Sequence, residues 1–226
     1  MSELKRESPL IGRKEARNGV SASGETGVTL RECPFLGHVS IRGEVDDTAF
    51  TAACAQVLGV ALPTTPNTQV QGDGITVCWL RPTEWLLLSA GEDVQARIDQ
   101  LRTALDGVHA GVIELSGGQT LIEVRGAHAM DTLAKGTTLD LHPRQFGADQ
   151  CARTLLAKTT AFIRVVEPGQ AFEIVVRRSF ADYLWQWLYD AAGEYNCTVE
   201  PPQASEPVTV EAPQDSESAA GAGGRS

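Results

Sequence analysis

Apolar and polar positions alternate along the chain at two periods, which switch repeatedly between two residues and about 3.6 residues. Residues 47–58 carry apolar side chains at i, i+3, i+4, i+7 and i+8, so they are predicted to form a helix with one buried face. An aspartate at 46 or 47 can cap the start of this helix, and Gly59 can end it. The other elements predicted in this half are strands at 36–42, 75–80, 84–89 and 112–115 and a helix at 94–105.

The second half of the chain repeats the order of the first. Each half starts with a strand, an Arg-Gly pair and a helix, and the two pairs are Arg42-Gly43 and Arg125-Gly126. The sequence therefore predicts an α+β fold of two βαββαβ-like modules packed as a pseudo-duplicate. The elements predicted in this half are strands at 120–125, 154–158, 162–166 and 172–177 and helices at 127–135 and 180–192.

The two ends of the chain lack both periods. Residues 1–26 mix charge with Gly and Ser and are predicted to be a flexible extension. Residues 201–226 are rich in Pro, Ala, Ser and Gly and bury too little apolar surface to offset ordering entropy, so they are predicted to be disordered. The folded domain is expected to span residues 27–200.

Composition and charge narrow the function classes. With 226 residues and 42% hydrophobic side chains, the chain can bury a substantial core. A formal net charge of −10 gives no electrostatic reason to bind nucleic acid or an anionic membrane. No apolar run is long enough for export or for a membrane span, so the expected location is the cytoplasm. The 5 cysteines form no C-x-x-C pair and are expected to be reduced.

Motifs that carry chemistry are not found in the sequence. The Gly-Gly and Gly-Asp-Gly runs are interpreted as turns rather than phosphate loops, and Ser116 does not lie in a G-x-S-x-G turn. The four histidines are scattered singly, although a metal site assembled from distant residues stays open. No catalytic, cofactor-binding or metal-binding residue is therefore assigned, and the chain alone is expected to bind no cofactor.

Two segments are candidates for contact with a partner. The loop 135–144 concentrates polar groups, and within it Asp140 and His142 could form an acid-base pair or simply support the loop together with Arg144. In the last helix, Trp185 and Tyr189 project away from the predicted core face, as interface anchors do. A terminal segment of the same chain could equally cover them. The core face predicted for this helix consists of Phe180, Leu184, Trp187, Leu188 and Ala191.

Several separate motifs, in order, resemble the sarcosine oxidase gamma subunit family. The resemblance covers about residues 8–192. The motifs that carry it are Ser8-Pro9-Leu10, 62–68 (LPTTPNT), 79–87 (WLRPTEWLL), 133–136 (LAKG), 139–144 (LDLHPR), 151–158 (CARTLLAK) and 178–185 (RSFADYLW).

The resemblance implies a fold similar to the folate-binding aminomethyltransferase of the glycine cleavage system. It also implies a heterotetramer in which alpha and beta subunits carry FAD, FMN, NAD and the tetrahydrofolate site, a delta subunit carries zinc, and gamma is structural. Such an assembly oxidises sarcosine to glycine and passes the methyl carbon to tetrahydrofolate or releases it as formaldehyde. By this resemblance, the expected partners are the alpha, beta and delta subunits.

Alternative functions stay open. The chain could be a stand-alone folate-binding protein similar to the aminomethyltransferase, but the run 135–138 departs after two residues from the K-G-C-Y-x-G-Q-E type of loop that such a protein would show. It could also be the gamma subunit of a related oxidase or dehydrogenase of N-methylated amino acids. A ligand-binding regulatory domain is a third alternative, which the sequence neither supports nor excludes.

Overall fold

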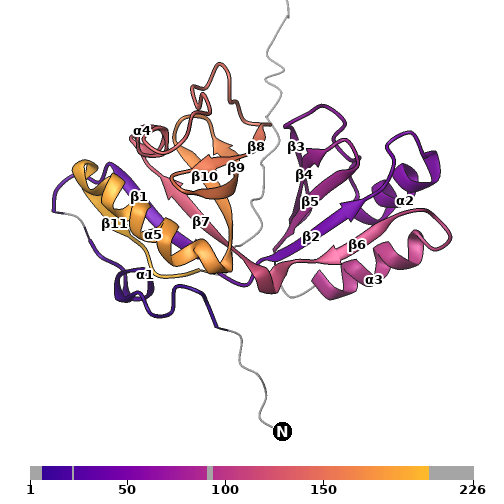
Figure 1. Cartoon of the computed structure of the whole chain (residues 1–226), viewed down its shortest axis with the longest axis horizontal. Helices are drawn as coiled ribbons and strands as arrows, with labels where there is room; N and C mark the ends of the chain where they lie inside the picture. The colour runs from indigo at the N-terminus through magenta and orange to yellow at the C-terminus, as the bar shows by residue number, and fades with distance from the viewer. Residues whose placement is uncertain (1–6, 22, 91–93, 204–226) are drawn as a thin grey trace, which may run out of the picture.

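The computed structural model describes residues 7–21, 23–90 and 94–203. These residues form two β-sheets that lie next to each other, with the main helices on the outer faces of the sheets (Figure 1). Three apolar cores hold the layers together, one between each sheet and its own helices and a third between the two sheets. The predicted α+β class is confirmed.

The first module is a five-stranded sheet with two helices. Its strands lie in the order β3-β4-β5-β2-β6. Helix α2 begins as predicted, because the Asp47 carboxylate accepts a hydrogen bond from the Ala49 backbone N–H at 2.8 Å, and it ends at Gly59 with φ 72°. The elements are β2 (Gly37–Arg42), α2 (Thr48–Leu58), β3 (Gln69–Gly72), β4 (Ile75–Arg81), β5 (Glu84–Ser89), α3 (Val94–Ala104) and β6 (Gly111–Glu114).

The second module repeats this arrangement in a six-stranded sheet with the order β11-β1-β7-β10-β9-β8. Its elements are β7 (Gln119–Arg125), α4 (Ala129–Ala134), β8 (Cys151–Leu156), β9 (Thr159–Glu167), β10 (Ala171–Arg177), α5 (Arg178–Ala192) and β11 (Cys197–Val199). The extra strand β1 (Val28–Cys33) is inserted between β7 and β11.

The pseudo-duplicate is confirmed, with β3 and β11 added to the four strands predicted in each module and β1 as a further strand of the second sheet. Both modules run βαβββαβ, and the strand order of one sheet matches that of the other once β1 is set aside. The Arg-Gly pairs end the first strand of each module. A side chain at Gly43 would come within 2.5 Å of the Phe50 ring, and one at Gly126 within 2.4 Å of the Gly27 carbonyl oxygen. Glycine is needed at both positions because neighbouring atoms leave no room for Cβ.

The sheets are joined directly along one edge. The Gln69 backbone N–H donates to the Asp149 carbonyl at 2.9 Å, and the Cys151 N–H donates to the Asn67 carbonyl at 2.9 Å. The Gln69 side chain reaches further and donates to the Val165 carbonyl at 2.7 Å. These bonds tie β3 of one sheet to β8 and β9 of the other and fix the space between the sheets.

The N-terminal segment is part of the fold where the structure describes it. Leu10 and Ala16 are buried in the core of the second module, and α1 (Lys14–Asn18) lies in this segment. Arg13 forms a bidentate pair with Asp182 of α5, at 2.5 and 2.8 Å. The expectation of a flexible extension is therefore wrong for residues 7–21. The predicted disordered tail lies, from residue 204, outside the described residues.

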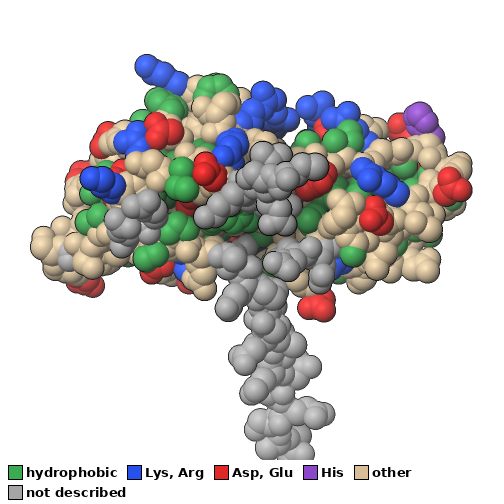
Figure 2. Space-filling model, turned by 90° about the horizontal axis from the view of Figure 1, so that it is seen from below, with side chains coloured by type: hydrophobic (Ala, Val, Ile, Leu, Met, Phe, Trp, Pro, Cys, Tyr) green, Lys and Arg blue, Asp and Glu red, His purple; other side chains and the backbone are tan. Residues whose placement is uncertain are grey.

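The described surface mixes both charges. The face seen in Figure 2 carries basic, acidic and apolar side chains interspersed over both halves. All 5 cysteines are free, and four of them are buried. Within the described ranges, no helix has the length and apolar character needed to cross a bilayer.

Candidate functional site

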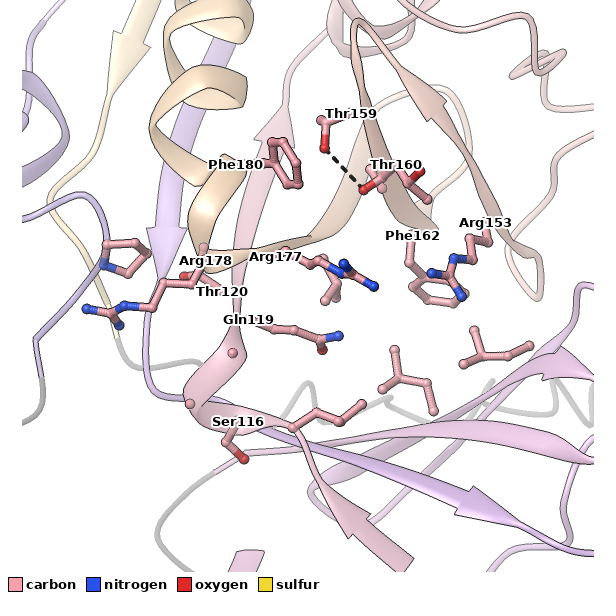
Figure 3. A pocket seen from close by; sticks show the side chains of 18 of the residues that line it. Ser116, Gln119, Thr120, Arg153, Thr159, Thr160, Phe162, Arg177, Arg178 and Phe180 are labelled. Atoms are coloured by element: carbon pink, nitrogen blue, oxygen red, sulfur yellow. Dashed lines mark hydrogen bonds between the residues drawn. The ribbon is translucent and has the colours of Figure 1, made fainter.

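An open cleft lies between the two sheets and has a volume of about 1440 Å³. Strands of both sheets line it, together with the connection between β6 and β7 and the start of α5 (Figure 3). It continues the space that the third core fills elsewhere, since Leu86, Phe162 and Val175 belong both to that core and to the cleft lining. The cleft is thus the unfilled end of the space between the sheets.

The wall formed by the five-stranded sheet holds its cations in ion pairs. Glu84 is 8% exposed and accepts from Arg42 at 3.0 Å and from the Ser40 hydroxyl at 2.9 Å. Arg81 lies 3.4 Å from the other carboxylate oxygen of Glu84. Burial opposes ionisation of this carboxyl, but the hydrogen bonds from Ser40 and Arg42 outweigh it and hold the pKa of Glu84 below its ordinary value. Glu84 offsets one of the two positive charges of this wall, and Glu114 on the same sheet equals the other in number.

The opposite wall carries cations without such partners. Arg153 on β8, Lys158 in the turn after it and Arg177 at the end of β10 are exposed, and among the described residues none of them forms an ion pair. Figure 3 shows the Arg153 and Arg177 side chains extending into the space between the sheets, whereas Arg178 points to the other side of the α5 start. This wall concentrates uncompensated positive charge in a chain of formal net charge −10.

Apolar side chains surround these cations. Phe35, Leu155 and Phe180 line the cleft and are 50%, 63% and 44% exposed. Large apolar residues of this kind are costly to leave in water, and they gather here beside arginines. The cleft therefore offers both charge and apolar surface to a ligand.

Several hydroxyl and carboxylate groups beside the cleft are engaged in hydrogen bonds. The Ser116 hydroxyl accepts from the His38 backbone N–H at 3.1 Å, and the Thr120 hydroxyl donates to Glu32 at 2.9 Å. Burial raises the pKa of Glu32, although hydrogen bonds from Ser8 and Thr120 partly offset this. No paired nucleophile and base results from this geometry. Within the described ranges, no three His, Cys, Asp or Glu side chains gather closely enough to hold a metal ion.

The predicted loop lies apart from this cleft. Asp140 accepts from the His142 backbone N–H at 3.0 Å, and His142 Nδ1 accepts from the Arg144 backbone N–H at 3.2 Å. Asp140 and His142 thus shape the loop rather than form an acid-base pair with each other. Leu141 and Phe146 anchor the loop in the core of the second module, while the three polar side chains are exposed. Contact with a partner remains a prediction for Asp140, His142 and Arg144.

The prediction for the last helix is wrong at Trp185. This side chain is 0% exposed and belongs to the core, and Tyr189 is partly buried against the same core. Phe180, expected in the core, is exposed at the cleft. The buried residues of α5 are Ala181, Leu184, Trp185, Leu188 and Ala192.

Apolar residues occur nearly all round α5, so their positions alone did not fix which face is buried. Ala181 and Ala192 were the overlooked signal, because small residues let a helix lie close to a sheet. The alternative interpretation, cover by a terminal segment, is favoured instead, since Leu10 and Ala16 share the core with Trp185.

Sequence reasoning missed the cleft residues. Arg177 and Phe180 come from segments that the sequence placed in an ordinary strand and in a helix core, and Arg153 directly precedes the predicted strand 154–158. The only available signal was the cluster of basic residues at the ends of predicted strands, as in Arg177-Arg178. Their convergence depends on the packing of the two sheets.

Comparisons with known proteins agree with one another. A family profile described as "Sarcosine oxidase, gamma subunit family" matches residues 42–194. The chain is 35% identical over 194 residues to the sarcosine oxidase subunit gamma of Corynebacterium sp. (strain U-96), covering 84% of this chain and 92% of the relative. It is 34% identical over 193 residues to the subunit gamma of Arthrobacter sp, covering 84% of this chain and 91% of that one.

Two solved structures are similar. A chain of the heterotetrameric sarcosine oxidase from Corynebacterium sp. U-96 in complex with pyrrole 2-carboxylate matches with a TM-score of 0.75 and 32% identity, over 84% of this chain and 96% of that chain. The glycine cleavage system aminomethyltransferase T from Bartonella henselae matches with a TM-score of 0.56 and 16% identity, over 79% of this chain and 48% of that one. The second match confirms the predicted likeness of fold. On the combined evidence of sequence profile, relatives and structure, this chain belongs to the sarcosine oxidase gamma subunit family.

Proposed function

We propose that this chain is a structural, non-catalytic gamma subunit of a heterotetrameric sarcosine oxidase. The observation that carries the proposal is the match to one chain of such an oxidase with a TM-score of 0.75 and 32% identity. The match covers 84% of this chain and 96% of that chain. The assembled enzyme would oxidatively demethylate sarcosine to glycine with tetrahydrofolate as the one-carbon acceptor.

The protonation and burial of the cysteine thiols and of His38 support a non-catalytic role. Burial raises the pKa of Cys33 and Cys54 to about 12 and that of Cys197 to about 11, so these thiols stay protonated at neutral pH. His38 is buried, and burial lowers its pKa to about 4, which leaves it neutral and out of reach of a substrate. FAD, FMN, NAD, tetrahydrofolate and zinc would then be held by the alpha, beta and delta subunits.

Co-expression with the other subunits of the oxidase tests this function. We expect the chain to co-purify with them in constant proportion, and the isolated chain to be colourless and to produce no hydrogen peroxide from sarcosine. Flavin absorbance that stays with the isolated chain through gel filtration, or peroxide production by it, would contradict the structural role. A complete complex that is active on another N-methylated amino acid but not on sarcosine would place the chain in a related oxidase.

A further inference from the structure

We propose that the cleft between the sheets is a docking site for an acidic, extended segment of a partner subunit that also carries an apolar side chain. The inference rests on the proposed function, because it needs the chain to be a subunit of a larger assembly. It goes beyond that function by naming the surface and the chemistry of what binds there.

Charge is the first argument. Leaving out Arg178, which points to the other side of the α5 start, the cleft lining includes 5 basic side chains (Arg42, Arg81, Arg153, Lys158, Arg177) and 3 acidic ones (Glu7, Glu84, Glu114), a balance of +2 in a chain of formal net charge −10. On the five-stranded sheet, Glu84 and Glu114 equal Arg42 and Arg81 in number, so the excess positive charge lies on the other wall. Cations grouped without counter-ions repel one another, and an anionic partner relieves that repulsion.

The start of α5 adds to the positive electrostatic potential of the cleft. The helix has 15 residues, and its cap residue Arg177 makes no side-chain hydrogen bond to the first turn. The first backbone N–H groups of a helix have no partner within the helix and favour negative charge. Arg177 and Phe180, which flank these groups, both line the cleft. A carboxylate bound beside Arg177 could use them.

Apolar exposure is the second argument. Seven large apolar side chains are exposed among the described residues, and three of them, Phe35, Leu155 and Phe180, line this one cleft. Aromatic residues and arginines are the types enriched at the centres of protein interfaces. A partner with an apolar side chain among its carboxylates would cover this surface.

The volume of the cleft favours a polypeptide segment over a small molecule as its occupant. Pockets for small ligands typically hold about 300–1,000 Å³. This cleft holds about 1440 Å³ and is lined by residues from both sheets. Figure 3 shows it as a gap between two walls, with Arg153 and Phe162 on the strands and Phe180 on the helix. An extended chain segment fits such a gap better than a compact ligand.

Charge reversal in the cleft is the test. The double variant Arg153→Glu with Arg177→Glu changes two exposed residues that form no ion pair with any described residue, so its fold should be kept. The matched control is Lys14→Glu with Arg102→Glu, which makes the same change of net charge at exposed positions on α1 and α3, outside the cleft lining. Each full-length protein is titrated with the purified remaining subunits at low and at physiological salt, and its thermal midpoint is measured alone.

We expect the cleft variant to raise the dissociation constant at least tenfold, and the control to stay within twofold of the wild type. The cleft variant should keep the wild-type thermal midpoint. In the control, Arg102 loses its bond to the Val112 carbonyl and its pair with Asp99, so a small drop of the midpoint there does not bear on docking. Arg153→Lys with Arg177→Lys should bind nearly as well as the wild type. The wild-type interaction should weaken as salt rises.

Other outcomes would overturn the inference. If the wild type assembles and the cleft variant binds equally tightly, the cleft is not the docking site and the proposed function stands. If the wild type does not bind the other subunits at all, the proposed function itself fails. A thermal midpoint raised by citrate in the wild type but not in the cleft variant, with assembly unchanged, would make the cleft a small-anion site. If deletion of residues 204–226 removes the effect of charge reversal, the acidic end of this chain is the occupant.

Discussion

The space between the sheets has two ends that are built from the same strands. They differ in whether the charged side chains are buried in ion pairs or exposed without them. At the closed end, Arg31, Glu123, Glu173 and Arg164 lie opposite one another in register across four neighbouring strands. Arg164 and Glu173 are 5% and 6% exposed and are joined at 2.6 Å. At the open end, Arg153 and Arg177 reach into the cleft without ion pairs among the described residues.

Strand β10 carries a buried, paired charge toward one end and an exposed charge at the other. Glu173, Val175 and Arg177 alternate with core residues, so all three face the other sheet. Glu173 is buried in an ion pair, Val175 lies in the apolar core between the sheets, and Arg177 is exposed at the cleft. Buried charge is tolerated only when it is paired, whereas an unpaired cation needs water or a partner. The open end is therefore better explained as a surface that binds a partner than as a poorly filled core.

The largest expected effect comes from breaking the buried ion pair. Arg164→Met leaves Glu173 without its partner in the dry end of the space, and we expect a loss of about 3–5 kcal/mol in the free energy of unfolding. The double variant Arg164→Met with Glu173→Leu should recover most of this loss, because no unpaired charge remains. Urea unfolding measures both. Equal destabilisation by the single and the double variant would show that packing, and not charge pairing, governs this end.

Leucines at the two ends should respond very differently to truncation. Leu88 is 4% exposed in the core between the sheets, so Leu88→Ala should cost about 2–5 kcal/mol of unfolding free energy. Leu155 is 63% exposed at the cleft, so Leu155→Ala should change stability by less than about 0.5 kcal/mol in the isolated chain. Similar losses in the two variants, measured by chemical unfolding, would mean that the cleft is closed in solution.

His38 makes the closed end sensitive to pH. It lies opposite Leu88 in register and is 1% exposed, and burial lowers its pKa to about 4. The unfolded chain binds a proton to this imidazole below its ordinary pKa of 6.5, whereas the folded chain does not until about 4. Stability should therefore fall as pH falls from 6.5 towards 4, by up to about 3 kcal/mol.

His38→Leu should remove most of this pH dependence, and His109→Gln, at an exposed position before β6, should leave it intact. Unfolding free energies measured between pH 7.5 and 4 give the comparison. A wild-type curve that matches that of His38→Leu would contradict the burial of a neutral imidazole.

The smallest effects on stability are expected within the cleft, where its two walls should differ. Arg177→Gln removes a cation that forms no ion pair within the described part of the chain, so the thermal midpoint should hardly change. Arg42→Gln takes a partner from Glu84, which is 8% exposed, and should lower stability by about 1 kcal/mol. Loss of stability in Arg177→Gln of the same size as in Arg42→Gln would show that the second wall is compensated as well.

Local patterns in the sequence were enough to predict much of the fold. Helix α2 and its cap at Asp47 follow from periodicity and capping chemistry, which involve residues only a few positions apart. Strand β3, of sequence QVQG, was missed because its polar residues make contacts that only the tertiary fold supplies: Gln69 bonds across to the other sheet.

The cleft could not be predicted because it depends on register between distant segments. Gln119 and Arg177 become neighbours only through the pairing of β7 with β10, and Arg153 and Phe162 through that of β8 with β9. The misjudged face of α5 has a similar cause. Trp185 is buried in a core that it shares with Leu10 and Ala16, which are distant in the sequence, so no local pattern specifies this contact.

Hydrogen exchange tests most directly whether the open end of the space between the sheets is the docking surface. The backbone amides of residues 178–180 lie in the first turn of α5, where they have no acceptor within the helix, so they should exchange rapidly in the isolated chain. In the complex with the other oxidase subunits, we expect their exchange, and that of Lys158, to slow at least tenfold, while exchange in α2 and α3 stays unchanged. Unchanged exchange at 178–180 together with new protection over α2 and α3 would contradict the account.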